Sequence, residues 1–151
     1  MKKKRISIYL FFCLLFFTFC TSSTNDFEKT IDLKNNWKSN FVANYSFKIT
    51  NNKPKTISIL LRNNNEYEFS NIYFFVQHTY PNGVKETDTL QYFLANKKGQ
   101  WLGSGFTQIK QNLLELKPAK AYATGLHKVT VFHGMRKKNL IGLEDITLVL
   151  N

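Results

Sequence analysis

The sequence has 151 residues, of which 43% are hydrophobic and 15% aromatic, and this suits one domain around one core. It carries 21 basic and 10 acidic residues, and the basic ones beyond the first five positions are scattered. No run reaches the roughly five or six like charges typical of a nucleic-acid-binding tail, so we expect no nucleic-acid partner. Two cysteines, Cys13 and Cys20, are too few for a disulfide framework or a cysteine metal site.

The N-terminus has the layout of an export signal. A cationic block, residues 2–5, precedes the uncharged run 6–19, which is shorter than the roughly 20 residues that cross a bilayer as a helix. Cys20 follows at the place where bacterial lipoproteins are cleaved and acylated. Phe19 departs from the small residues usual before the cut, so a signal anchor that is never cleaved stays the alternative.

The sequence therefore predicts three parts. Residues 1–19 form a lipoprotein signal peptide, 20–36 a lipidated cysteine with a flexible tether, and 37–151 a folded domain. The tether is inferred because residues 21–36 are polar and show no hydrophobic period. This places the protein at a membrane of the cell envelope, with its domain outside the cytoplasm.

The first predicted strands show alternating hydrophobicity. Residues 41–49 alternate with a period of two, and residues 57–62 resume the alternation after a break at 51–54. Residues 70–80 are apolar on both faces near the middle, which predicts a central strand between two layers. Pro81-Asn82-Gly83 predicts a tight turn, and residues 84–95 form the returning strand.

The second half is less regular at its start. Residues 108–117 fit either a short helix or a strand, and Pro118 is expected to end that element. Residues 122–132 form a strand with His127, Val129 and Val131 inward. After a turn at 134–142, residues 145–150 form the closing strand. About seven or eight strands with frequent turns predict an all-β protein, an antiparallel β-sandwich.

A Gly-rich bend, Gly99 to Gly105, is the most distinctive local motif. Its glycines do not match the spacing of a nucleophile elbow, a dinucleotide-binding loop or a phosphate-binding loop. Gly103 and Gly105 instead permit tight turning and close backbone approach. Trp101 either packs at the edge of the core, the reading we favour, or lies exposed and contacts a partner or a sugar ring.

The remaining polar residues indicate no catalytic or metal site. His127 and His133 lie roughly 20 Å apart along one strand, and His78 falls on an apolar face, so we expect no metal. The acidic pairs are typical of solvated surface. Arg136 could clamp an acidic group, but a pair with Glu144 or Asp145 across the hairpin is favoured. We therefore expect neither an enzyme nor a cofactor.

The order of these signals resembles the GldH family, lipoproteins associated with gliding motility in the Bacteroidetes. The resemblance extends over nearly the whole mature chain, and the order and spacing of several short motifs carry it together. The motifs are Leu61-Arg62-Asn63 with Tyr67 and Asn71, Tyr80-Pro81-Asn82-Gly83, Asp88-Thr89-Leu90 with Tyr92, Leu94 and Ala95, Gly99 to Gly105, and His133-Gly134-Met135-Arg136 with Gly142 and Asp145.

The resemblance implies a non-enzymatic lipoprotein of the gliding motility and type IX secretion machinery, acylated at Cys20 and acting through contacts with other envelope proteins. The aromatic and Gly-rich loops are the expected contact surface. The alternative is a carbohydrate-binding β-sandwich lipoprotein of the cell envelope. The candidate partner contacts are Trp101, Gly103, Gly105, His133 and Arg136.

Overall fold

The computed structural model describes residues 25–151. The predicted signal peptide, the lipid attachment at Cys20 and the start of the tether lie outside the described residues. Within residues 25–151 the secondary structure consists of ten strands, all paired antiparallel.

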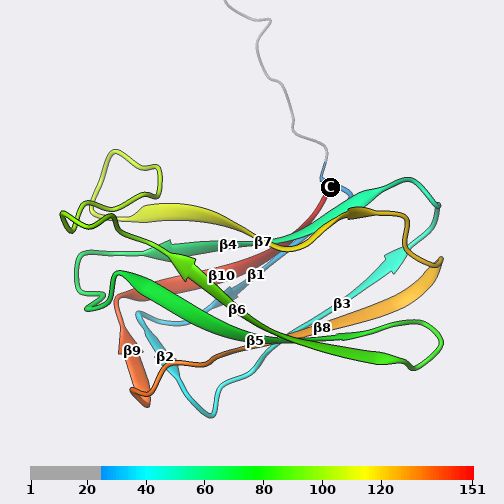
Figure 1. Cartoon of the computed structure of the whole chain (residues 1–151), viewed down its shortest axis with the longest axis horizontal. Helices are drawn as coiled ribbons and strands as arrows, with labels where there is room; N and C mark the ends of the chain where they lie inside the picture. The colour runs from blue at the N-terminus through cyan, green and yellow to red at the C-terminus, as the bar shows by residue number, and fades with distance from the viewer. Residues whose placement is uncertain (1–24) are drawn as a thin grey trace, which may run out of the picture.

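Two four-stranded sheets form the layers (Figure 1). The first sheet has the order β1-β10-β4-β7 and the second β3-β8-β5-β6, while β2 and β9 make a small ribbon. The prediction of an all-β antiparallel sandwich is therefore confirmed. The bounds are β1 Phe27–Asp32, β2 Asn36–Lys38, β3 Ala43–Ile49, β4 Lys55–Asn63, β5 Asn71–Thr79, β6 Lys85–Phe93, β7 Lys110–Lys120, β8 Gly125–His133, β9 Asn139–Ile141 and β10 Leu143–Leu150.

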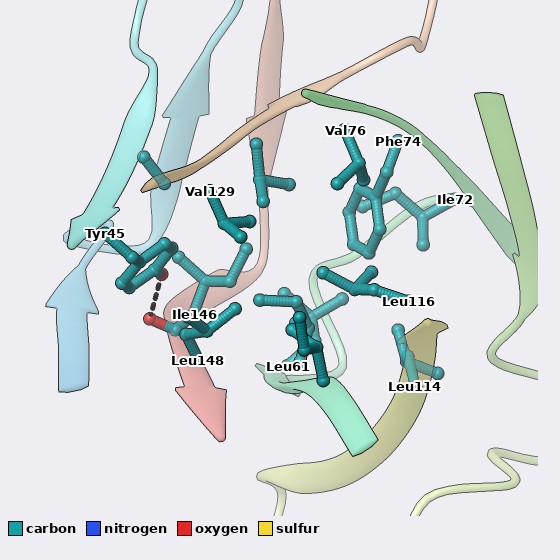
Figure 2. Packing of buried hydrophobic residues seen from close by; sticks show 14 of the residues in the cluster. Tyr45, Leu61, Ile72, Phe74, Val76, Leu114, Leu116, Val129, Ile146 and Leu148 are labelled. Carbon is teal, nitrogen blue, oxygen red and sulfur yellow. Dashed lines mark hydrogen bonds between the residues drawn. The ribbon is translucent and has the colours of Figure 1, made fainter. Parts of the chain in front are cut away.

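The core fills the space between the two sheets because each strand turns its apolar residues inward at every second position. In β3 the alternation is complete: Tyr45 and Phe47 are buried, and Ser46 between them is exposed. Figure 2 shows side chains from both layers meeting, with the Tyr45 hydroxyl donating to the carbonyl of Ile146 at 2.8 Å. This bond ties β3 of one sheet to β10 of the other, and burial raises the pKa of Tyr45.

The predicted tether is wrong in its second half, because residues 27–32 form β1. This strand pairs with β10 from Phe27 opposite Leu150 to Asp32 opposite Asp145. Only Phe27 and Ile31 are partly buried, and the Phe27 ring lies 5.5 Å from the ring of Phe47. An edge strand needs few apolar residues to be held by its neighbour, so its sequence looks like a polar linker.

The element expected at 108–117 is a strand, β7, and Pro118 does not end it. β7 lies at the edge of its sheet, next to β4 alone, and the register between the two shifts near Ile57. Proline is tolerated at such a place because an edge strand with a bulge does not need every amide for pairing. The turn expected at 134–142 likewise contains β9, paired with β2.

β5 is central within its sheet, between β8 and β6, but it does not lie between two layers. Ile72, Phe74 and Val76 are buried, whereas the alternate residues Tyr73 and Phe75 are only partly buried and face outward. The second apolar face read from the sequence is therefore an aromatic outer surface of the molecule.

The two ends of the sandwich differ in what they carry. The chain enters at one end, where the Asp26 amide donates to the carbonyl of Leu150 and Lys55 pairs with Asp26. The loops that join β4 to β5, β6 to β7 and β8 to β9 gather at the opposite end (Figure 1). We call these the anchor end and the loop end.

Candidate functional site

The segment 64–70, between β4 and β5, holds the loop end together. Tyr67 is buried and its hydroxyl donates to the carbonyl of Asn71 at 2.9 Å. The Asn64 amide donates to the carbonyl of Gly142 at 2.8 Å, and the Asn64 side chain donates to Glu144. Lys137 pairs with Glu68 from the loop after β8. Contacts from three directions therefore converge on one short loop.

Trp101 joins the β6–β7 loop to this segment. Its Nε1 donates to Oδ1 of Asn65 at 3.0 Å, and its ring centroid lies 6.5 Å from that of Tyr67. Its backbone makes an isolated bridge to Ala95, and its side chain is partly buried against the core. Trp101 thus positions the loop and still presents part of its ring to solvent.

Gly103 and Gly105 lie where the loop backbone meets β7. A Cβ at Gly103 would lie 2.7 Å from the carbonyl oxygen of Gln111, and one at Gly105 would lie 2.4 Å from that of Ile109. Ser104, between them, bridges to Gln111. Both glycines therefore allow close backbone approach, and neither has a side chain with which to contact a partner.

His133 ends β8 on the inward side and is 5% exposed. Its ring meets Trp37 edge-on at 5.7 Å, and burial lowers the pKa of His133. A buried imidazole cannot touch a partner directly, which removes His133 from the surface residues available for contact. Its neighbour Gly134 continues along β5, with its amide donating to the carbonyl of Tyr73 at 2.7 Å.

Arg136 is exposed and does not make the ion pair with Glu144 or Asp145 that we favoured. Arg62 on β4 holds Asp145 instead, because the register places those two residues side by side on neighbouring strands. Arg136 borders a surface hollow of about 690 Å³ at the loop end. The hollow combines rings, aliphatic carbon and cations, and its lining consists of Phe69, Asn71, Tyr73, Gly134, Met135, Arg136 and Lys137.

A buried histidine pair was not predicted. His78 and His127 face inward from neighbouring strands, with 3.0 Å between Nε2 of His78 and Nδ1 of His127. The second nitrogen of His127, Nε2, lies 2.8 Å from the carbonyl of Ala123, so Nε2 carries the proton and Nδ1 accepts. Both positions were read as inward-facing, but the pairing of β5 with β8 that joins them could not be read from either strand.

We expect this pair to make the protein sensitive to acid. Burial, with the neighbouring His127, lowers the pKa of His78 from 6.5 to about 4. Between these two pKa values His78 binds a proton in the unfolded chain but not in the folded chain. The free energy of unfolding therefore falls as the pH drops from about 6.5 to 4. Urea titrations at pH 7.5, 5.5 and 4.5 should show this fall, and the His78→Gln variant should show a shallower one. If the free energy of unfolding falls equally with pH in the wild type and in His78→Gln, the prediction is contradicted.

Lys117 connects the two sheets at the edge where β6 and β7 face each other. Its Nζ lies 3.0 Å from Glu86 and 2.5 Å from Asp88, and its side chain is 9% exposed. Hydrogen bonds from Tyr80 and Lys117 lower the pKa of Glu86 to about 2. A carboxylate held ionised in this way stabilises the sandwich and is poorly suited to act as a general acid at neutral pH.

Residues 25–151 hold no group of three or more side chains of the types that ligate metals, placed so as to share an ion. Nor does that part of the chain contain a helix with the length and hydrophobicity needed to cross a bilayer. The charged groups described above are held by other protein groups, apart from the exposed Arg136. The arrangement at the loop end is suited to binding a partner.

Comparison with known proteins gives a consistent result over the chain. A family model described as GldH lipoprotein matches residues 25–150. The protein named "Gliding motility lipoprotein GldH" of Flavobacterium johnsoniae is 30% identical over 152 residues, covering 97% of this chain and 94% of the relative. The "Gliding motility lipoprotein GldH homolog" of Christiangramia forsetii is 27% identical over 150 residues, covering 95% and 90%.

Solved structures resemble the chain only distantly. The glucuronidase BtGH115A of family GH115 aligns with a TM-score of 0.42 at 12% identity, covering 82% of this chain and 14% of the enzyme. Latent PorU from Porphyromonas gingivalis aligns with a TM-score of 0.36 at 8% identity, covering 86% and 14%.

Proposed function

This chain belongs to the GldH lipoprotein family, and on that basis we propose that it is a non-enzymatic component of the gliding motility and type IX secretion machinery. It is held at a membrane of the cell envelope through acylated Cys20, and it acts through contacts with other proteins of that machinery. The observation that carries this proposal is the family match over residues 25–150, which includes every strand and loop of the sandwich.

The geometry of the described residues supports an adaptor held at one end. Five residues lie between Cys20 and Asp26, and the six residue-to-residue steps, at most about 3.6 Å each, reach roughly 20 Å. Asp26 lies at the anchor end, so acylation of Cys20 keeps that end close to the bilayer. The loop end is separated from the anchor end by the length of a nine-residue strand, about 30 Å. The hollow beside Arg136 is therefore available to partners.

Arg136 supports a contact role because its cationic group borders a hollow that also offers apolar surface. Such mixed surfaces are typical of binding sites, where apolar area supplies affinity and a few polar groups set orientation. The guanidinium favours a carboxylate on the partner. Trp101, Gly103 and Gly105 hold the β6–β7 loop in place and so contribute to the shape of the loop end.

We expect the Arg136→Glu variant to lose spreading on agar when it replaces the chromosomal copy, while its amount in the membrane stays unchanged. Reversing the charge repels an acidic partner without touching the core. Lys98→Glu, which makes the same charge change in the turn after β6, serves as the matched control and should spread normally. Normal spreading of Arg136→Glu, or unchanged spreading and secretion after deletion of the gene, would contradict the proposal.

The anchor is tested separately by labelling with a palmitate analogue. Label on the wild type that disappears in Cys20→Ser supports acylation, since the mature chain contains no other cysteine. An unlabelled wild type would identify the leader as a signal anchor that is never cleaved, and the contact role of the loop end would still stand on the spreading test.

A further inference from the structure

The outward side of the β3-β8-β5-β6 sheet, here called the open face, has an unusual distribution of charge. Its strands point Lys48, Lys85 and Lys128 outward. The carboxylates of these four strands are Glu86 and Asp88, and both turn inward to Lys117. The strands therefore present lysines to solvent and no acidic side chain.

The outer side of the other sheet is balanced by comparison. There Arg62 and Asp145 form a pair, and Glu115 is exposed on β7. A general excess of lysine in the sequence does not account for this difference, because it would affect both sheets. The open face is thus a distinct cationic surface.

The three lysines lie close together at the anchor end of the face. Thr79 is in register with Lys128 on one side and with Lys85 on the other, and Lys48 is opposite Leu126. Within residues 25–151 none of the three lysines makes an ion pair. They are free to bind an external anion.

Aromatic rings follow the lysines along the same face. The centroids of Phe75 and Phe132 lie 5.3 Å apart, and both side chains are partly exposed. A Cβ at Gly134 would lie 2.9 Å from the Phe75 ring, so the ring lies down over bare backbone. Tyr73 follows at the next outward position of β5. The planes of Phe75 and Phe132 are tilted by 38° to each other, so the rings form an uneven aromatic tract, and Tyr73 at its end also lines the hollow beside Arg136.

The rest of the open face offers hydrogen-bonding groups. Hydroxyl and amide side chains occupy most other outward positions, and Leu126 is the single aliphatic one in the four strands, with 54% of its surface exposed. The core of a protein–protein interface is usually more apolar than this. Rings, hydroxyls and amides between lysines fit a ligand that has flat faces, many hydroxyl groups and repeated acidic groups.

We propose that the open face binds an acidic polysaccharide. Sugar rings stack on Phe75, Phe132 and Tyr73, side-chain hydroxyls and amides bond the sugar hydroxyls, and the lysines bind the carboxylates. This goes beyond the contact role proposed for the loop end and does not depend on it: Tyr73 borders both surfaces, but the lysines, Phe75 and Phe132 do not line the hollow beside Arg136.

The test is native affinity electrophoresis of the mature protein, extracted in a non-ionic detergent, through gels containing one polymer each. Polygalacturonate should retard the protein strongly. Uncharged β-1,4-galactan should retard it weakly, and so should polyglutamate, which has charge without sugar rings. Equal retardation by polyglutamate would overturn the proposal, because it would show attraction of charge alone; no retardation by polygalacturonate would also overturn it.

Variants locate the binding on the open face. Lys48→Gln with Lys128→Gln, and separately Phe132→Ser, should each weaken retardation by polygalacturonate about tenfold. Lys97→Gln with Lys98→Gln removes the same charge from the β6–β7 loop and should change nothing. Thermal melts followed by circular dichroism serve to check that Phe132→Ser is folded. Equal weakening in both lysine pairs would overturn the assignment, as would capture of an envelope protein by the open face in place of the glycan.

Discussion

The Gly142→Ala variant is expected to lose about 3 kcal/mol or more of unfolding free energy. Gly142 has φ of 86°, a region that alanine adopts only with strain. A Cβ there would lie 2.2 Å from the backbone nitrogen of Tyr67. Backbone cannot rotate away as a flexible side chain can, so the β9–β10 turn and the 64–70 loop would have to separate. Urea unfolding measures the loss.

The Gly99→Ala variant separates the two causes of the lost stability, which are the strain of a positive φ and the steric contact with the backbone of Tyr67. Gly99 has a similar φ of 77°, but an added Cβ would meet nothing within 4 Å. This variant carries the strain of positive φ alone and should lose about 1 kcal/mol. If the two variants lose the same amount, the contact between Gly142 and Tyr67 does not hold the loop end together. Because the loop end carries the Arg136 hollow, Gly142→Ala should also reduce spreading.

The Lys117→Met variant is expected to lose about 2 kcal/mol. Methionine fills the same apolar path but leaves Glu86 and Asp88 facing each other without their shared cation. The expected loss of stability is smaller than for a fully buried ion pair, because the side chain of Glu86 is 44% exposed and that of Asp88 is 32% exposed. Tyr92, whose hydroxyl donates to the carbonyl of Glu115, remains as the other link between β6 and β7.

Lys120→Met is the matched control for Lys117→Met. Lys120 lies on the same strand, but it is exposed and lies over the rings of Tyr80 and Tyr122. Its loss should cost less than about 1 kcal/mol. Lowering the pH from 5 towards 2 should narrow the difference between the two variants, because hydrogen bonds from Tyr80 and Lys117 lower the pKa of Glu86 to about 2, and the stabilisation that Lys117 gives is lost as Glu86 is protonated. A difference that does not depend on pH would show that Lys117 acts through packing alone.

Local patterns in the sequence predict most strands, for a simple reason. In β3, β4 and β5 one face is buried, and burial selects apolar residues at every second position. Pro81-Asn82-Gly83 predicts its turn because the backbone there needs positive φ at Gly83, which the structure has at 83°. The prediction of a tether over β1 was wrong, and so was the prediction that Pro118 ends β7, because edge strands bury little and carry polar residues or proline.

The sites depend on contacts that are distant in the sequence. Arg62 meets Asp145, and His78 meets His127, only because non-consecutive strands pair in a particular register. The residues next to Arg136 in the sequence do not indicate that Asp145 pairs with Arg62. The open face likewise depends on how the strands are oriented. β6 turns Glu86 and Asp88 inward, and β3, at the other edge of the same sheet, has no acidic residue.

The sequence was enough to predict an all-β chain that resembles the GldH family, because periodicity, turn chemistry and motif order are local properties. The tertiary structure alone decided which candidate residues reach the surface. It buried His133 against Trp37, left Arg136 exposed beside the hollow and placed Gly103 against β7. Strand order and register, which bring together residues far apart in the chain, are the physical reason for that difference.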